Sequence, residues 1–301
     1  MRTLPKLVLP ALLTVYFVWG STYLAIHVAL QSFPPFLLMG TRFLVAGALL
    51  FGWLRWRGAP VPNRRQWRDG GIVGILLLGG GMGLIGLAQQ SVSSGMTAVF
   101  IACSPLILAL CSGAFGEWPT GREWGGIAIG FAGAALLAGG GEFSAQPLGA
   151  LALLGAIICW NFGSVLSLKK LSLAPGAMGF ASEMLSGGVF LLLIALLRGE
   201  SLATSVTGPA FFAWAYLVVA GSLAAFTAYM YLLSTVSPAL VSSYAYVNPI
   251  IAVALGSAFA DEVIGKREAV AMGIILSSVL LLTTAKSAAS PSASSAAEPT
   301  L

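Results

Sequence analysis

Aromatic rings and hydrogen-bonding groups recur at four-residue spacing in two apolar stretches of the sequence. Trp19 and Tyr23 form one pair, and Trp160 and Ser164 form another, with Asn161 beside them. Because an α-helix makes one turn in 3.6 residues, each pair lies on one helix face. A face that mixes aromatic rings with a few polar groups suits a nonpolar or aromatic solute with a polar head. Packing between helices is the alternative, since such side chains also join neighbouring helices in membranes.

Two prolines, Pro105 and Pro249, interrupt apolar stretches that are otherwise helical in character. Proline has no N–H, so each one frees the carbonyl group four residues earlier, which in lipid needs a partner or a wet cavity. We therefore expect both prolines to kink their helices and to line a cavity or gate; a static kink is the alternative. The polar residues before these prolines complete the predicted binding set: Thr97, Ser104, Tyr244 and Asn248.

Three ionisable residues lie within apolar stretches: His27, Arg42 and Glu183. Ionisable groups are costly in a membrane and are therefore functional candidates. A carboxyl group in nonpolar surroundings is readily protonated, which makes Glu183 the candidate for proton coupling. A structural role is the alternative for Arg42 and Glu183, and His27 is expected to anchor a helix end at the membrane surface.

Several classes of function are excluded by missing motifs. The sequence has no phosphate-binding GxxxxGK[ST] loop, and its single histidine has no nucleophile motif near it, so we expect neither an ATPase nor another enzyme. Its three cysteines, Cys103, Cys111 and Cys159, have neither metal-site nor disulfide spacing. We expect no cofactor and no metal. The net charge of +5 comes from basic residues in short loops, which argues against nucleic acid as a partner.

The elements that must position these residues are membrane-spanning helices. Of 301 residues, 58% are hydrophobic and 8% are charged, too few charges to cover a water-soluble domain. A spanning helix needs about 20 apolar residues, which predicts an all-α polytopic membrane protein with ten transmembrane helices. The expected spans are 7–29, 34–54, 70–90, 96–115, 122–141, 147–167, 177–198, 210–233, 238–259 and 265–285, followed by a disordered tail at 287–301.

The basic residues predict how the chain is oriented. With the N-terminus inside, the inner segments hold eleven Lys and Arg residues and the outer segments three. Positive residues favour the cytoplasmic side, so we expect a multi-pass protein of the inner or plasma membrane with both termini in the cytoplasm. Glycines around residues 121–130 allow close helix packing, either within the chain or between copies in a homo-oligomer.

The two halves of the sequence repeat one another. Four pairs recur at nearly constant separation: Trp19 and Trp160 (141 positions), Arg42 and Glu183 (141), Pro105 and Pro249 (144), and Glu117 and Glu262 (145). The pattern predicts two five-helix units, 1–143 and 144–286. An odd number of spans in each unit inverts the second copy, giving a 5+5 inverted repeat typical of secondary transporters.

These repeated motifs resemble the EamA-type branch of the drug/metabolite transporter superfamily over about residues 7–285. The resemblance is carried by Trp19-Gly20-Ser21-Thr22-Tyr23, Arg42-Phe43-Leu44, Ser104-Pro105-Leu106, Gly116-Glu117, Cys159-Trp160, Asn248-Pro249-Ile250 and Asp261-Glu262. It implies a 5+5 inverted repeat around a central substrate cavity, similar to amino-acid exporters, the aromatic amino-acid exporters included, and to metabolite exporters.

Together these features predict a small-molecule carrier in a lipid bilayer. A site for phosphorylated anions should offer several cations, but Arg42 stands alone within the spans. We therefore expect export of neutral or zwitterionic metabolites, amino acids in particular, by alternating access. A non-transporting scaffold, a channel or a receptor subunit is the alternative.

Overall fold

The computed structural model describes residues 5–139, 146–202, 205–236, 240–241 and 243–289, and within them every regular element is a helix. The first half contains α1 (Val8–Thr14), η1 (Val15–Trp19), α2 (Gly20–Ala29), α3 (Pro35–Trp56), α4 (Arg64–Gly74), η2 (Ile75–Met82), α5 (Gly83–Ala88), α6 (Ser94–Ile101), α7 (Ser104–Gly113) and α8 (Gly121–Ala138). The second half contains α10 (Pro147–Lys169), α11 (Ala177–Leu197), α12 (Gly208–Tyr216), η3 (Leu217–Ala224), α13 (Ala225–Thr235), α15 (Tyr244–Phe259) and α16 (Lys266–Ala289).

The elements named η are short π-helical stretches inside longer rods. Thus α1, η1 and α2 form one rod, α4, η2 and α5 a second, and α12, η3 and α13 a third. The all-α prediction is confirmed, and helices lie at all ten predicted positions.

In the part of the chain that the structure describes, seven helical stretches are long and apolar enough to cross a membrane: Val8–Ala29, Pro35–Trp56, Arg64–Ala88, Ser94–Gly113, Pro147–Lys169, Ala177–Leu197 and Gly208–Leu232. The helix at the ninth predicted span, α15, is apolar but has only 16 residues. Helices α8 and α16 lie at the fifth and tenth predicted positions. The chain is therefore multi-pass, and the full count of ten spans stays a prediction.

Several helix ends differ from the predicted ones because side-chain caps set them. Helix α4 begins six residues before the predicted position 70, where Asn63 and Gln66 satisfy each other's backbone N–H groups in a capping box. Helix α16 continues to Ala289, past the predicted start of the tail at 287. The predicted unit boundary at residues 143 and 144 and the tail residues 290–301 lie outside the described part of the chain.

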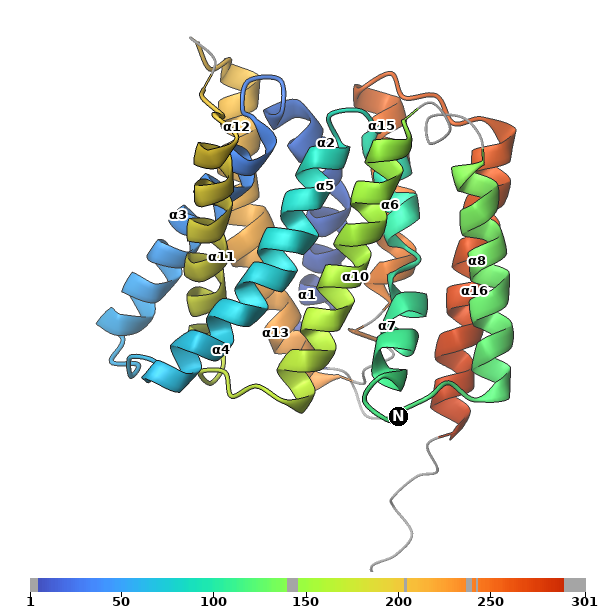
Figure 1. Cartoon of the computed structure of the whole chain (residues 1–301), viewed down its shortest axis with the longest axis horizontal. Helices are drawn as coiled ribbons and strands as arrows, with labels where there is room; N and C mark the ends of the chain where they lie inside the picture. The colour runs from blue at the N-terminus through green and yellow to red at the C-terminus, as the bar shows by residue number, and fades with distance from the viewer. Residues whose placement is uncertain (1–4, 140–145, 203–204, 237–239, 242, 290–301) are drawn as a thin grey trace, which may run out of the picture.

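Helices from the two halves pack against each other throughout the bundle (Figure 1). Helix α3 packs along α11, and α8 packs along α16 at the right-hand edge of the view. The rod of α4, η2 and α5 packs on α10, while α1 and α2 pack on α13 and α12, and α6 packs on α15. Close contact at the α8–α16 pair depends on glycine: a Cβ at Gly130 would lie 2.6 Å from Ser278 Oγ. The glycines predicted to permit close packing thus include one used within the chain.

Large apolar side chains on the outside of this bundle are exposed, as lipid contact requires. Trp56, Leu197 and Phe212 are 82%, 82% and 72% exposed, whereas Phe43 and Leu191 are 1% and 0% exposed in the interior. Lipid, unlike water, can solvate such an apolar surface.

Candidate functional site

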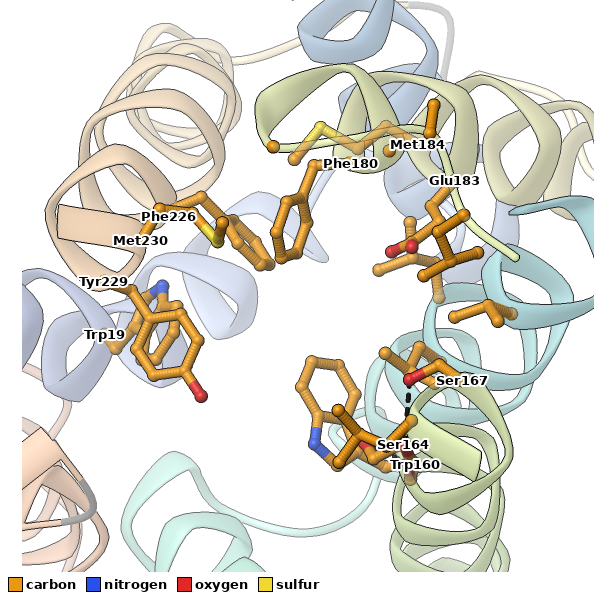
Figure 2. Close-up of a pocket in the computed structure, with 18 of the residues that line it drawn as sticks. Trp19, Trp160, Ser164, Ser167, Phe180, Glu183, Met184, Phe226, Tyr229 and Met230 are labelled. Atoms are coloured by element: carbon orange, nitrogen blue, oxygen red, sulfur yellow. Dashed lines mark hydrogen bonds between the residues drawn. The ribbon is translucent and has the colours of Figure 1, made fainter. Parts of the chain in front are cut away.

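A cavity of about 360 Å³ lies between the two halves of the bundle. Side chains from η1, α4, η2, α10, α11, α13 and α15 line it, so both predicted repeat units contribute (Figure 2). Its volume is within the range of small-molecule pockets.

Aromatic rings form one continuous wall of this cavity. The ring centroid of Trp19 lies 5.4 Å from that of Phe226, 5.2 Å from that of Tyr229 and 5.1 Å from that of Tyr244. Phe180 continues the wall, with its centroid 5.0 Å from that of Phe226. These are favourable edge-to-face or tilted separations, so helices distant in sequence hold a single aromatic surface in place.

Across the cavity from this wall lies one face of α10, with Trp160, Ser164 and Ser167 (Figure 2). The Ser164 hydroxyl donates to the Trp160 carbonyl (2.7 Å), and the Ser167 hydroxyl donates to the Ser164 carbonyl (2.8 Å). Both hydroxyl protons are therefore used within the helix, although the oxygens keep acceptor capacity toward the cavity.

Glu183 is the charged residue among those that line the cavity. It is 5% exposed, and its carboxyl group points toward the central space (Figure 2). Within the described part of the chain, this carboxyl group makes no hydrogen bond or ion pair with protein. The backbone of α11 at Glu183 packs directly against α4, since a Cβ added at Gly74 would lie 2.4 Å from the Glu183 carbonyl oxygen.

The rim of the cavity lies at one end of the bundle. Leu168, at the end of α10, is 83% exposed, and Gly176 lies in the loop before α11. This end also carries Lys169, which pairs with Glu117. The cavity is thus reached from the end of the bundle that holds the most basic loops.

The equivalent positions in the other half are closed. Residues 141 positions before Ser167, Phe180 and Glu183 are Ile26, Met39 and Arg42, and they are 1%, 0% and 2% exposed. The counterparts of these three cavity-lining residues are therefore packed in the interior of the bundle.

Arg42 lies outside the cavity. Its Nε donates to the Ser222 hydroxyl (3.0 Å), and its guanidinium carbon lies 4.8 Å from the centre of the Phe43 ring. Ser222 in turn donates to the Leu217 carbonyl (3.0 Å) within η3. The π-helical stretch thus presents the hydroxyl that holds the buried cation.

Two predicted amide residues join helices and do not line the cavity. The Asn161 side chain donates to the Ser104 hydroxyl (2.7 Å) and to the Ile157 carbonyl (2.8 Å). With its amide oriented to satisfy both groups, Asn248 donates to the Tyr16 carbonyl (3.1 Å) and the Tyr244 carbonyl (3.2 Å).

Tyr23 and Thr97 lie toward the closed end. The Tyr23 carbonyl accepts a hydrogen bond from Gln89 (3.2 Å), and the buried Thr97 hydroxyl has no partner among the described residues. His27 follows Tyr23 by four residues, and its Nδ1 is likewise buried without a partner among the described residues. These groups do not line the cavity, and a role for them in substrate binding stays a prediction.

The two prolines occupy different environments. The chain breaks its helix at residues 102–103, and Pro105 stands in the first turn of α7. Pro249 lies inside α15, which continues through it. The break also separates Thr97 from Ser104, which the sequence places on one helix face. A gating role for either proline stays a prediction.

Several cavity residues are not among those predicted from the sequence: Ser167, Phe180, Phe226, Tyr229 and Met230. Phe226 and Tyr229 are three positions apart on one helix, a spacing that also places two rings on one helix face and could have identified them. Phe180 stands three positions before Glu183 and shares its helix face in the same way.

The sequence model of the EamA-like transporter family matches residues 6–139 and 147–284. An uncharacterized inner membrane transporter of Escherichia coli K12, YedA, is 43% identical over 277 residues, covering 92% of this chain and 90% of that protein. An uncharacterized transporter of Archaeoglobus fulgidus is 26% identical over 216 residues, covering 69% of this chain and 73% of that protein. A solved crystal structure superposes with a TM-score of 0.64 at 19% identity, over 92% of this chain and 98% of the other, and so shares the fold.

Proposed function

The chain belongs to the EamA-like transporter family, and we propose that it exports small neutral or zwitterionic metabolites, aromatic or other hydrophobic amino acids among them, by alternating access. It is a membrane transporter and not an enzyme. The observation that carries the substrate proposal is the cavity between the halves, where an aromatic wall faces a single carboxyl group. This combination suits an amphipathic solute with a nonpolar body and an amine.

Helix packing supports the ten-span, 5+5 inverted arrangement. If the halves correspond, the contact of the first span with the eighth must have a counterpart between the sixth and the third, and both contacts occur. The π-helical stretches η2 and η3 begin at Ile75 and Leu217 and end at Met82 and Ala224, each pair 142 residues apart. An irregularity repeated at corresponding places is expected of two related units.

The open and closed halves support alternating access. A cavity is accessible from one end, and the counterparts of three of its lining residues, Ile26, Met39 and Arg42, are packed, so exchanging the conformations of the halves would close one side and open the other. Because the open end carries the most basic loops, we assign it to the cytoplasm, with both termini on that side and the chain in the cell's inner or plasma membrane.

Counterflow in proteoliposomes tests this function. Purified protein loaded with unlabelled phenylalanine, leucine or another candidate solute should accumulate the labelled solute transiently. Empty liposomes and liposomes with heat-inactivated protein are the controls. If no solute of a broad metabolite panel exchanges or binds, the scaffold, channel or receptor alternative replaces the carrier proposal.

A further inference from the structure

The charges around the cavity are unequal. Glu183 supplies a carboxyl group, and none of the described lining residues is Lys, Arg or His. Arg42, the residue at the position equivalent to Glu183 in the other half, is buried outside the cavity, where it contacts Ser222 and Phe43. A solute's carboxylate would therefore leave water without a cationic partner, which costs free energy, whereas a solute's ammonium group would gain one.

The uncharged surface of the cavity has the same preference. The faces of aromatic rings carry negative charge and attract cations, and Trp is the strongest in this respect. Trp19, Tyr229 and Tyr244 meet at centroid separations of 5.1–6.0 Å on one wall, and Trp160 lies across the cavity from Trp19 and Tyr229 (Figure 2). Rings on two sides can surround a nonpolar body while the carboxylate of Glu183 neutralises the cationic end.

The carboxyl group of Glu183 has no protein partner among the described residues, although it is 5% exposed. A buried ionisable group without a partner is destabilising, so such groups are usually paired with a ligand, hydrogen-bonded to water or neutralised by a proton. Its orientation into the cavity places the carboxyl group within reach of a solute that enters there.

We propose that the cavity binds amphipathic organic monocations, an aromatic or aliphatic body with one ammonium group, with Glu183 as the counter-ion and the ring wall of Trp19, Tyr229 and Tyr244 around the body. This inference rests on the proposed carrier function and extends its substrate class from neutral and zwitterionic solutes to monocations. Among solutes with the same ring, it places the simple amine above the amino acid, because the amino acid carries a carboxylate that the cavity does not neutralise.

Four solutes that share a phenyl ring and differ in charge test the inference. They are 2-phenylethylammonium (cation), phenylalanine (zwitterion), 2-phenylethanol (neutral) and 3-phenylpropionate (anion). Calorimetric titration of the full chain in nanodiscs should give the tightest binding for the cation, by at least about tenfold over the zwitterion, and the weakest for the anion.

Variants of one carboxyl group separate charge recognition from shape. Glu183→Gln should weaken binding of the cation by at least about tenfold and change binding of 2-phenylethanol by less than about twofold. Glu183→Asp should be intermediate. Asp261→Asn, which removes an exposed carboxylate outside the cavity, is the matched control and should bind all four solutes as the parent does. Gel filtration and thermal unfolding establish that each variant is folded.

Each outcome bears on one of the two proposals. Phenylalanine binding as tightly as the amine, or cation binding unchanged in the folded Glu183→Gln variant, overturns the monocation inference. Counterflow of amino acids in that case leaves the carrier function standing. Binding of the amine without counterflow of that amine or of any metabolite supports the cation site and overturns the carrier. If none of the four solutes binds, the monocation inference is wrong, and counterflow with the metabolite panel decides the carrier separately.

Discussion

At the scale of single residues, the proposed function rests on how a few side chains face one cavity. Trp19 and Trp160 occupy equivalent positions 141 residues apart, and both line it. Asn161 follows Trp160 directly but points at Ser104 on another helix. Of these two adjacent residues, Trp160 faces the cavity, and Asn161 joins α10 to the helix of Ser104.

Replacing Trp19 and Trp160 together by Ala should lower counterflow by at least about fivefold, because each ring contact with the solute is worth about 0.5–1.5 kcal/mol. The variant should still insert and purify as a monodisperse protein. Trp56→Ala, which removes an 82% exposed tryptophan, is the control and should transport normally. Normal counterflow by the folded double variant would remove the basis for the cavity assignment.

Glu183 is also the residue at which we expect proton coupling. If the carboxyl group exchanges a proton in each cycle, an imposed pH gradient should drive solute flux in the parent protein. In Glu183→Gln that dependence should disappear, while counterflow without a gradient continues at a measurable rate. A gradient effect of equal size in parent and variant would assign coupling to another group.

The residue scale also shows how far the sequence could lead. Four-residue spacing and intramembrane charge pointed to Trp19, Trp160, Tyr244 and Glu183, which line the cavity. Spacing identifies a helix face but not the element opposite that face. Hence Asn248, which shares a predicted helix face with Tyr244, bonds backbone carbonyls instead of lining the cavity, and four-residue spacing does not identify Tyr229.

At the scale of elements, close backbone contacts position the carboxyl group. Helix α11 lies against α4 at Gly74, where the added Cβ would meet the Glu183 carbonyl oxygen. Gly71 is one turn earlier on α4, and a Cβ there would lie 3.8 Å from the nearest atom, Ser186 Oγ. The two glycines provide a matched pair on a single helix.

Gly74→Ala should lower the free energy of unfolding by about 1–3 kcal/mol, because backbone cannot move aside as a side chain can. It should also weaken solute binding, since the shift displaces Glu183. Gly71→Ala should leave both unchanged. Thermal unfolding in detergent and solute titration measure the two effects, and equal behaviour of the two variants would refute the contact.

A second element contact closes the far end of the bundle. The Glu262 carboxylate accepts hydrogen bonds from the backbone N–H groups of Ser94 (2.7 Å) and Gly95 (2.8 Å) at the start of α6. A carboxylate at a helix N-terminus is favoured by the free N–H groups and by the helix dipole.

Glu262→Gln should therefore lower the unfolding free energy by about 1–3 kcal/mol, as expected for loss of hydrogen bonds to a charged group. The neighbouring Asp261→Asn should have little effect, since Asp261 is exposed and Asn tolerates its positive φ of 51°. Denaturation midpoints of the two variants give the comparison, and equal midpoints would contradict the capping role.

Element ends were the part of the fold least predictable from sequence. The length of each apolar stretch predicts where a helix lies, but it does not include polar residues at the helix end. Asn63 caps α4, which therefore begins within the basic segment before the apolar stretch. The π-helical stretches leave no compositional trace either, because their i→i+5 bonds depend on packing against the neighbouring helix.

At the scale of the whole molecule, one end is open and the equivalent end is closed. Ser167 lines the cavity, and its counterpart Ile26 is 1% exposed. The repeat in the sequence could indicate two exchangeable halves, but it could not indicate which of them is open, because both halves follow the same pattern.

Cysteine accessibility tests this asymmetry. After Cys103, Cys111 and Cys159 are replaced by Ala, Ser167→Cys should react with a membrane-impermeant maleimide added from the cytoplasmic side. Ile26→Cys should react at least about tenfold more slowly from either side. Fast labelling of Ser167→Cys only from the outside would reverse the orientation assigned here.

The opposite charges of Arg42 and Glu183 at equivalent positions have a consequence for affinity. In the exchanged conformation, Arg42 would face the cavity from the position in its own half that Glu183 has now in the other half. A cation would therefore be attracted on one face of the membrane and repelled on the other. Detailed balance then requires that loading shifts the conformational equilibrium toward the attractive face. The half-saturation concentration should accordingly be lower when the solute is offered from the side of Glu183, which makes the carrier asymmetric in affinity even where no gradient acts on it.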